Sequence, residues 1–360
     1  MQGTCLPVLL LTVPVTGTRN PLTQPFSSTS IWNMPIGTGA VYVAANLETT
    51  DPSGATWIAM PGADQEIIIL EPTAPLTPIY YSSAGWTSGA NRCVANSPQR
   101  QLADVPIPES LVVPSHGNND SATYLLADGQ SFMQSQPLAR CMAAGYGTSL
   151  VVWPPQSIYG DGIQGAHGGS GLSAFGGDLR VGELRPGGQP PHHVLKMAVD
   201  ATVDDYACTT MTQCYTWPAV AADDYAIGWY GSRRSTQPAS MVPGALLAIP
   251  ANVNIASLGL ETPPAQMLAW TLQNYGAYID DDTYKNGVDF DTENGPTDGS
   301  FITQFARDWG FSFTSRVREN TPWMRDVQRL LAALSVVTNN GPNSIGGGGT
   351  PLQPLAPPLQ

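Results

Sequence analysis

The residues best suited to chemistry lie between residues 159 and 293, where acidic, histidine and aromatic side chains gather among glycines. The densest stretch is YGDGIQGAHGGSGLSAFGGDLRVGEL, residues 159–184, which carries Asp161 and His167 inside a glycine run. Glycine adopts positive φ angles easily and lets a ligand approach the backbone closely. We therefore expect Asp161 and His167 to contact a substrate, and an ordinary glycine-rich loop is the alternative. The segment lacks the spacing of a phosphate-binding loop.

Glu183 follows the glycine run on a strand predicted over residues 178–184, between Arg180 and Arg185. Period-two alternation places Glu183 among apolar neighbours on one face of that strand. A glutamic acid in such surroundings is suited to donate a proton to a glycosidic oxygen. We expect Glu183 to act as a general acid and Arg180 to bind substrate. A buried Glu–Arg pair without a catalytic role is the alternative.

His192 and His193 adjoin a strand predicted over residues 193–201. Neighbouring side chains in a strand point to opposite faces, so at most one of the two faces a given site. The same geometry prevents the pair from chelating one ion, and we assign no metal-ligating residues. We expect His193 to assist catalysis, and a structural histidine is the alternative.

Two acidic runs follow, DDD over residues 280–282 and DFDTE over residues 289–293. We expect the first run at the C-terminus of a helix, where acidic groups oppose the helix dipole and so need another reason to be present. Asp281 is the candidate base or nucleophile of a carboxylate pair with Glu183. The spacing also loosely resembles a calcium-binding loop, although the EF-hand pattern is missing. A solvated acidic loop without a binding or catalytic role is the alternative.

Aromatic residues in loop-like sequence could form platforms on which sugar faces stack. Of these, we expect Trp217 to bind substrate, together with Tyr275 from the first predicted helix, while most of the others belong to the core. The aromatic residues in such segments are Trp57, Trp86, Trp153, Trp217, Tyr225, Trp229 and Tyr230.

The elements that must position these side chains are short apolar runs between Gly, Pro, Asn and Ser. Runs of this length and composition predict strands. No strand–helix alternation repeats, so we predict a mostly β protein, with a β-sandwich or jelly-roll-like single domain. The predicted strands cover residues 40–45, 66–71, 78–83, 110–114, 149–153, 178–184, 193–201 and 244–250.

Two or three α-helices are expected to decorate this domain near its C-terminus. The first begins after Thr262 with proline in its first turn, and its apolar stripe continues to Ile279. The second begins at Thr321-Pro322 and carries an apolar stripe to Leu334. Both are expected to cover one face of a sheet.

The composition of the chain limits the classes of molecule that it could bind. The chain has 15 Lys and Arg against 28 Asp and Glu, a formal net charge of −13, and its only lysines are Lys196 and Lys285. Such a surface repels nucleic-acid phosphates and anionic membranes, and no basic stripe offsets it. With 37 Gly and 33 Pro, the chain is also unsuited to a coiled coil.

The five cysteines favour a secreted protein with two disulfides. Cys208 and Cys214 bracket a five-residue loop, and Cys93 and Cys141 both lie in polar loop sequence that suits a second bond. Cys5 is left over. No Cys-x-x-Cys spacing occurs, which excludes a zinc ribbon. Five free thiols in a reducing compartment are the alternative.

The two ends of the chain differ from the middle. Residues 1–19 contain the apolar run LPVLLLTVPV, which is either a signal-peptide remnant or an N-terminal strand and is too short to span a bilayer. Residues 20–338 form the predicted domain. Residues 339–360 form a Gly/Pro-rich tail that is either a linker or an extended strap over the body.

Six segments in chain order resemble a broad, largely uncharacterised group of secreted bacterial and fungal proteins. In that group the matching segments read W-N-x-P-I, a strand ending in Glu-Val or Glu-Leu, H-A-L, W-P-A and Y-G-x-x-x-x-D. The resemblance implies secretion but no particular activity, and it marks Glu183, His193, Trp217, Tyr275 and Asp281 as matching positions. The segments here are SIWNMPIGTGAVYV, GGDLRVGEL, HHVLKMAVDA, YTWPAVAADDYA, GALLAIP and PAQMLAWTLQNYGAYIDDDT.

The tripeptide Glu183-Leu184-Arg185 is superficially similar to a motif of jelly-roll polysaccharide lyases, but their Q-I-H strand is missing. The expected function is therefore that of a secreted glycoside hydrolase acting on a polysaccharide or oligosaccharide. No cofactor is expected to be required, although calcium remains an option. The alternatives are a lyase, with Tyr275 or His193 abstracting a proton next to a uronate carboxylate, and a non-catalytic glycan-binding or cell-surface module.

Overall fold

The computed structural model describes residues 17–50, 59–96 and 100–360. In these residues the chain is mostly β, with two sheets and a few helices that lie mainly in the C-terminal part. The fold class predicted from the sequence is therefore confirmed. Cys5 and the apolar run over residues 6–15 lie outside the described residues.

The elements are short and are joined by long irregular segments. The strands are β1 Tyr42–Ala44, β2 Ala59–Ile69, β3 Leu76–Tyr81, β4 Gln101–Pro106, β5 Ala122–Leu125, β6 Ser131–Gln136, β7 Gly147–Ser149, β8 Val151–Ser157, β9 Gln164–His167, β10 Leu195–Val199, β11 Leu246–Ala248, β12 Ala277–Asp282, β13 Gly287–Gly295, β14 Gly299–Ser300 and β15 Ser335–Val337. The helices are α1 Ala201–Asp204, α2 Pro263–Asn274, α3 Phe301–Trp309 and α4 Pro322–Ala333.

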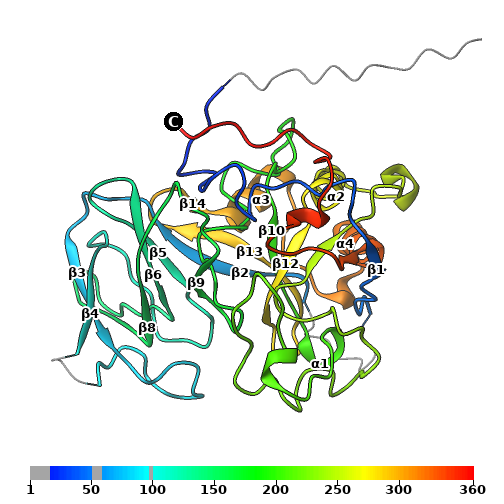
Figure 1. Cartoon of the computed structure of the whole chain (residues 1–360). Coiled ribbons are helices and arrows are strands. Elements are labelled where there is room, and N and C mark those ends of the chain that lie inside the picture. The colour runs from blue at the N-terminus through cyan, green and yellow to red at the C-terminus, as the bar shows by residue number, and fades with distance from the viewer. Residues whose placement is uncertain (1–16, 51–58, 97–99) are drawn as a thin grey trace, which may run out of the picture.

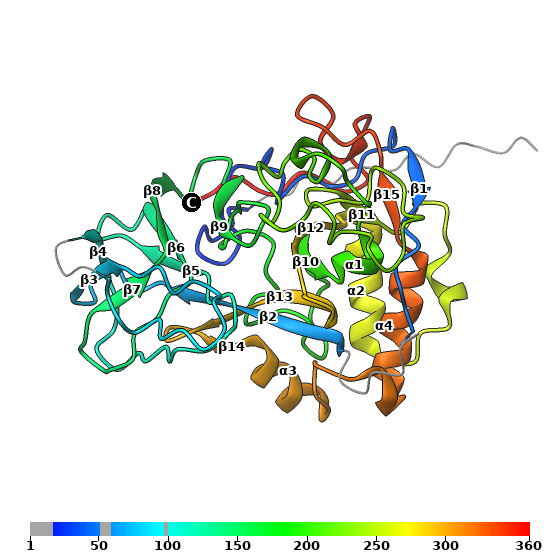
Figure 2. The same ribbon diagram turned by 90° about the horizontal axis from the view of Figure 1, so that it is seen from below.

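The large sheet has 11 strands in the order β1-β15-β11-β12-β10-β13-β2-β5-β6-β8, with β14 paired to β13. β10 runs parallel to β12, β13 to β2, and β2 to β5. These parallel pairs are joined by long crossovers without regular helix alternation, so the sequence carries no βαβ signal for them. The second sheet, β4-β3-β7, lies at the opposite end of the molecule from α2 and α4 (Figure 2).

Alternation along the central strands gives the large sheet one apolar face. Leu195, Met197 and Val199 of β10 are buried with Ile279 of β12 and Phe290 of β13. Helices α2, α3 and α4 cover this face, as predicted for the two helices that the sequence shows. The residues that alternate with these apolar ones face the other way, toward the glycine-rich segment. They include Lys196 of β10 and Asp289 and Asp291 of β13.

The first helix is shorter than its apolar stripe predicts. α2 ends at Asn274, and Ile279 belongs to strand β12. Gly276 ends the helical path because its φ of +79° favours glycine, and a Cβ there would lie 2.4 Å from the carbonyl oxygen of Leu247. The acidic run over residues 280–282 therefore lies on a central strand and not at a helix C-terminus, as we expected from the sequence.

Two further strand predictions are wrong. Residues 178–184 form turns, with a single bridge from Leu179 to Thr292, and Gly182 has a φ of +104°. Residues 110–114 contain only a bridge from Val113 to Arg140. Helix α4 begins after Thr321 as predicted, since the Thr321 hydroxyl accepts a hydrogen bond from Met324 N at 3.1 Å.

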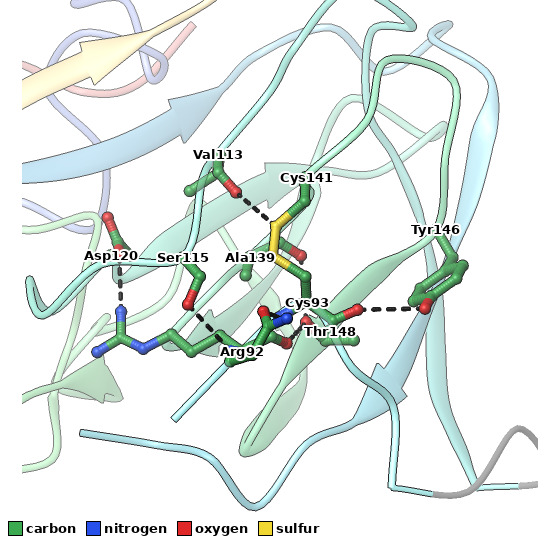
Figure 3. Close-up of a disulfide and its surroundings, with 10 residues drawn as sticks. Arg92, Cys93, Val113, Ser115, Asp120, Ala139, Cys141, Tyr146 and Thr148 are labelled. Carbon is green, nitrogen blue, oxygen red and sulfur yellow. Dashed lines mark hydrogen bonds and ion pairs between the residues drawn. A yellow bond between two sulfur atoms is a disulfide. The ribbon is translucent and has the colours of Figure 1, made fainter. Parts of the chain in front are cut away.

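Both predicted disulfides are present. Cys93–Cys141 closes 48 residues and Cys208–Cys214 closes six. The first bond ties together the loops around the small sheet (Figure 3). Next to it, Arg92 is buried and pairs with Asp120 at 2.8 Å.

The tail over residues 339–360 lies along the segment that precedes β1. Arg19 N donates to Pro358 O at 3.0 Å, and Gly37 bridges Pro351. In Figure 1 this tail, in red, crosses the top of the molecule beside the blue N-terminal segment. We refer to residues 339–360 as the strap.

Candidate functional site

The polar face of the large sheet is built around a bulge in β12. Met197 of β10 pairs with Ile279, but Val199 pairs with Asp282, so β12 carries one residue more than β10 over this stretch. Bulges re-aim side chains and are common next to active sites. Here the bulge contains Asp280 and Asp281.

Both bulge carboxylates lie against the end of β9 and the glycines after it. Asp280 Oδ2 is 3.0 Å from His167 Nδ1, and Gly169 N donates to Asp281 Oδ1 at 3.1 Å. A Cβ on Gly168 would lie 2.3 Å from the carboxyl carbon of Asp281, and the φ of Gly168 is +44°. Only glycine fits there, which explains part of the glycine run.

Gly169 is constrained from the other side. A Cβ on this residue would lie 2.8 Å from Asp223 Oδ1. The Gly168–Gly169 backbone therefore runs between two carboxyl groups, those of Asp281 and Asp223. The close approach that the glycine run predicted is an approach of carboxylates to the backbone.

Behind this backbone lies a buried charge cluster of six side chains, each at most 1% exposed. They are Glu66, His167, Asp178, Lys196, Asp280 and Asp291. His167 Nε2 lies 2.9 Å from Glu66 Oε1 and 3.2 Å from Asp291 Oδ2. Lys196 Nζ lies 3.0 Å from both Asp178 Oδ1 and Asp291 Oδ2, and it donates to Ser173 O at 2.8 Å.

Burial and mutual repulsion dominate the titration of this cluster. Burial raises the pKa of Glu66 to about 8 and that of Asp178 to about 6, although the charge of Lys196 opposes both shifts. Burial acts to lower the pKa of Lys196, but the charges of Asp178, Glu66 and Asp291 raise it well above its usual value. Four acids share two cationic side chains, so the cluster needs further positive charge or protons.

A second polar group connects the cluster to the surface. Asn119 Nδ2 donates to Asp64 Oδ2 at 2.5 Å and to Asp281 Oδ2 at 2.9 Å. Asp64 Oδ2 is also 3.7 Å from His167 Nε2, and the Asp64 side chain is 15% exposed. Asp64 and Asn119 are therefore the members of this group that reach solvent.

On the far side of the glycines, phenol and indole groups hold two carboxylates. The Tyr230 hydroxyl donates to Asp223 Oδ2 at 2.7 Å, and Trp229 Nε1 donates to Asp282 Oδ2 at 2.8 Å. Burial, followed by the charge of Asp281, raises the pKa of Asp223 to about 8. Burial raises the pKa of Asp282 to about 6.

An aromatic patch formed by Tyr225, Trp229 and Tyr284 adjoins these carboxylates. The rings of Trp229 and Tyr284 stack with centroids 4.9 Å apart, and Tyr225 meets both edge-on. Tyr284 is 65% exposed and Tyr225 40% exposed. Exposed stacked rings beside carboxyl groups suit a planar or sugar-like ligand.

The structure divides the residues predicted from the sequence into separate groups. Glu183 Oε1 lies 3.0 Å from His193 Nε2, and Glu183 Oε2 accepts from Arg180 N at 2.8 Å. Arg180 itself is buried and pairs with Glu293 at 2.9 Å. Glu183 and Asp281 have different partners, since Asp281 accepts from Gly169 N and Asn119 Nδ2.

The other predicted residues are also dispersed. His167 and Asp281 belong to the site described above. Tyr275 is 2% exposed and packs against Trp270, while Asp161 is exposed. Trp217 lines a cavity of about 250 Å³ with Tyr206, Tyr215, Asn340 and others, away from the carboxylates of the site.

Several central residues received no individual role from the sequence, although signals were present. Lys196 is one of two lysines and lies inside an apolar strand. Asp289 and Asp291 alternate with Val288 and Phe290, which is the pattern of a strand with one apolar and one acidic face. Glu66, at the start of an apolar run, gave a weaker signal. Nothing local pointed to Asp223.

Comparison with known proteins gives no family. No family model, curated protein or solved structure matches the chain. In the described part of the chain, none of the helices combines the length and apolar character needed to cross a membrane.

Proposed function

We propose that the protein is a secreted carbohydrate-active enzyme that hydrolyses glycosidic bonds with Asp223 and Asp281 as its carboxyl pair. The observation that supports this proposal is the position of these two carboxyl groups on either side of Gly168–Gly169, next to the exposed aromatic patch. Glycoside hydrolysis uses two carboxyl groups, one protonated and one ionised.

The surroundings of the two groups support different roles for them. Burial raises the pKa of Asp223 to about 8, which favours the protonated form near neutral pH and so a proton donor to the glycosidic oxygen. Burial raises the pKa of Asp281, and the hydrogen bonds that it accepts from the backbone N–H groups of Gly169 and Asp282 oppose that rise and favour its anion. Asp281 then acts as base or nucleophile, the role expected from the sequence. Asp223 takes the acid role that the sequence assigned to Glu183, whose carboxylate is engaged by His193.

The aromatic patch supports a glycan as the substrate. Tyr225 and Tyr284 are exposed, while the half-buried Trp229 stacks on Tyr284 and lies under Lys285 Nζ. The Trp229 N–H donates to Asp282, which holds these rings close to the carboxyl pair. A lyase is less well supported, because the ring of Tyr275 is buried. A non-catalytic glycan-binding module would need the patch but not the carboxyl pair.

The test is a digest of neutral and uronic polysaccharides by the purified protein, following reducing ends and the absorbance of unsaturated uronates. We expect new reducing ends without absorbance. Asp223→Asn and Asp281→Asn should each lower kcat by about 10²–10⁴-fold. Asp224→Asn is the matched control, since Asp224 is the exposed neighbour of Asp223, and it should leave kcat within about twofold.

The outcomes separate the alternatives. Full activity in both the Asp223→Asn and Asp281→Asn variants would refute the carboxyl pair. Uronate absorbance would identify a lyase. Glycan retention without turnover, abolished by Trp229→Ala, would identify a binding module. Thermal unfolding of each variant shows whether a loss of activity reflects chemistry or folding.

A further inference from the structure

The side chain of His167 is surrounded by carboxylates but makes no hydrogen bond within the described residues. Its Nε2 lies 2.9 Å from Glu66 Oε1 and 3.2 Å from Asp291 Oδ2, yet both ring nitrogens are without a hydrogen-bond partner. The oxygens are close enough, so it is their direction from the ring that does not suit donation. Both Asp291 oxygens and Glu66 Oε2 also lack hydrogen bonds, and all three residues are fully buried.

These separations are those of ligands around one ion. Nitrogen and carboxylate ligands lie about 2.0–2.2 Å from a divalent first-row cation. Two such ligands at a right angle are about 3 Å apart, because the diagonal of a square with sides of about 2.1 Å is about 3.0 Å. The three ligand atoms, one each from Glu66, His167 and Asp291, all lie within 4.8 Å of one another.

The second nitrogen of His167 is placed as in many metal sites. Nδ1 lies 3.0 Å from Asp280 Oδ2 without forming a hydrogen bond, and a small rotation of the ring onto an ion would let Nδ1–H donate to this carboxylate, the contact that orients a ligating histidine. The charges also favour a cation. With a neutral His167, the four acids of the buried charge cluster face only Lys196, and a divalent ion would cancel two of the three excess negative charges.

We propose that Glu66, His167 and Asp291 bind a divalent first-row cation of the Mn²⁺ or Zn²⁺ class. The imidazole nitrogen disfavours Ca²⁺ and Mg²⁺, which take oxygen ligands. This proposal differs from the calcium interpretation of the two acidic runs, because one residue from each run, Asp280 and Asp291, meets His167. Lys196 Nζ lies 3.0 Å from Asp291 Oδ2 and 3.3 Å from Glu66 Oε1, so binding of the ion requires the ammonium to share these two oxygens with it or to shift toward Asp178 and Ser173 O. The site does not depend on the hydrolase proposal.

The first experiment uses the full chain. After exhaustive dialysis, we would measure bound metal by elemental analysis and then titrate Mn²⁺ and Zn²⁺ by calorimetry, with Ca²⁺ and Mg²⁺ as separate arms. We expect about one Mn²⁺ or Zn²⁺ per chain and a higher Tm with the ion, because a ligand of the folded state stabilises it. For the Zn²⁺ form, X-ray absorption should show nitrogen and oxygen ligands without sulfur.

Variants then locate the ion. His167→Gln should remove stoichiometric binding, and Asp280→Asn should weaken it by about 10–100-fold through the orientation of the ring. His193→Gln is the matched control, since His193 is also buried and pairs with a carboxylate, Glu183. It should bind the ion as the parent does.

Three results would overturn the proposal: no binding of Mn²⁺ or Zn²⁺ to the folded parent protein, binding of Ca²⁺ alone, or binding that survives His167→Gln. The X-ray absorption measurement on the parent keeps the test decisive if His167→Gln fails to fold. None of these results depends on glycan hydrolysis, so a failed digest and a failed metal site are distinguishable.

Discussion

Arg180 offers the sharpest test of the structural reasoning, because the sequence suggested a substrate ligand and the structure shows a buried ion pair. Its guanidinium meets both oxygens of Glu293, at 2.9 and 3.2 Å, and the side chains are 5% and 2% exposed. Val181 N also donates to Glu293 Oε2 at 2.8 Å. In Arg180→Met, Glu293 would keep this one backbone donor and lose its counter-charge.

The expected cost of Arg180→Met is about 3–5 kcal/mol of unfolding free energy, the range for removing one partner of a buried pair. For 360 residues at about 2.1 cal/mol/K each, the unfolding entropy is about 0.75 kcal/mol/K, so Tm should fall by about 4–7 °C. Arg185→Met is the matched control. Arg185 pairs with Asp308 at 2.8 Å, but its side chain is 51% exposed, so we expect at most about 1 kcal/mol.

The assay is thermal and urea unfolding of the two single variants, of Glu293→Gln and of the double variant Arg180→Met/Glu293→Gln. Since Glu293→Gln removes the stranded charge, the double variant should be more stable than the sum of the single effects predicts, by about 2 kcal/mol. Equal losses in Arg180→Met and Arg185→Met, or strict additivity, would refute the reasoning. Unchanged stability with weakened substrate binding would restore the role predicted from the sequence.

Three further predictions concern the core, the disulfides and pH. Trp323→Ala should cost about 3–5 kcal/mol in urea unfolding, because the ring is 1% exposed among phenylalanines; a loss below about 1 kcal/mol would contradict this packing. Replacing Cys93–Cys141 by serines should cost about 4 kcal/mol and replacing Cys208–Cys214 about 2 kcal/mol, because the first closes 48 residues and the second six; the reverse order would contradict the loop-length argument. Burial raises the pKa values of Asp204 and Asp223 to about 8, so their stabilising effect is present at low pH and is lost as pH rises through about 8. Tm should therefore be higher near pH 5.5 than near pH 8.5, and Asp223→Asn should reduce the difference.

The parts of the fold that the sequence predicted are those that local pattern determines. The strand at β10, the start of α4 after Thr321, and both disulfides were all predicted and are present. The end of α2 was not predicted, because Ile279 continues the helical stripe beyond Gly276, whose φ of +79° and close approach to Leu247 O end the helix. Local periodicity carries no information about that contact.

The candidate site was predicted in part for a similar reason. His167 and Asp281 were singled out by residue type, and both lie in the site. Their partners come from segments far apart in the chain: Asp64 from β2, Asn119 from the loop before β5, and Asp223 from an irregular loop. Parallel pairing of β2 with β13 brings the acids together, and that pairing has no signature at either strand alone. Glu183, by contrast, lies in residues 178–184, where the sequence predicted a strand and the structure has turns.

The strap described above has a consequence for how the chain is made. β1, at residues 42–44, can pair with β15 only after residues 335–337 have been synthesised. In the same way, Arg19 N can donate to Pro358 O only after residue 358 has been synthesised. At about 5–20 residues per second, a ribosome needs about 15–60 s to synthesise the chain between β1 and β15. Throughout that time Arg19 and β1 lack these partners, whereas Phe26 and Trp32 find theirs at residues 158–162. The chain around Arg19 and β1 is therefore synthesised early but protected late, and a protease acting on nascent chains should cut it there until residues 335–358 have been synthesised.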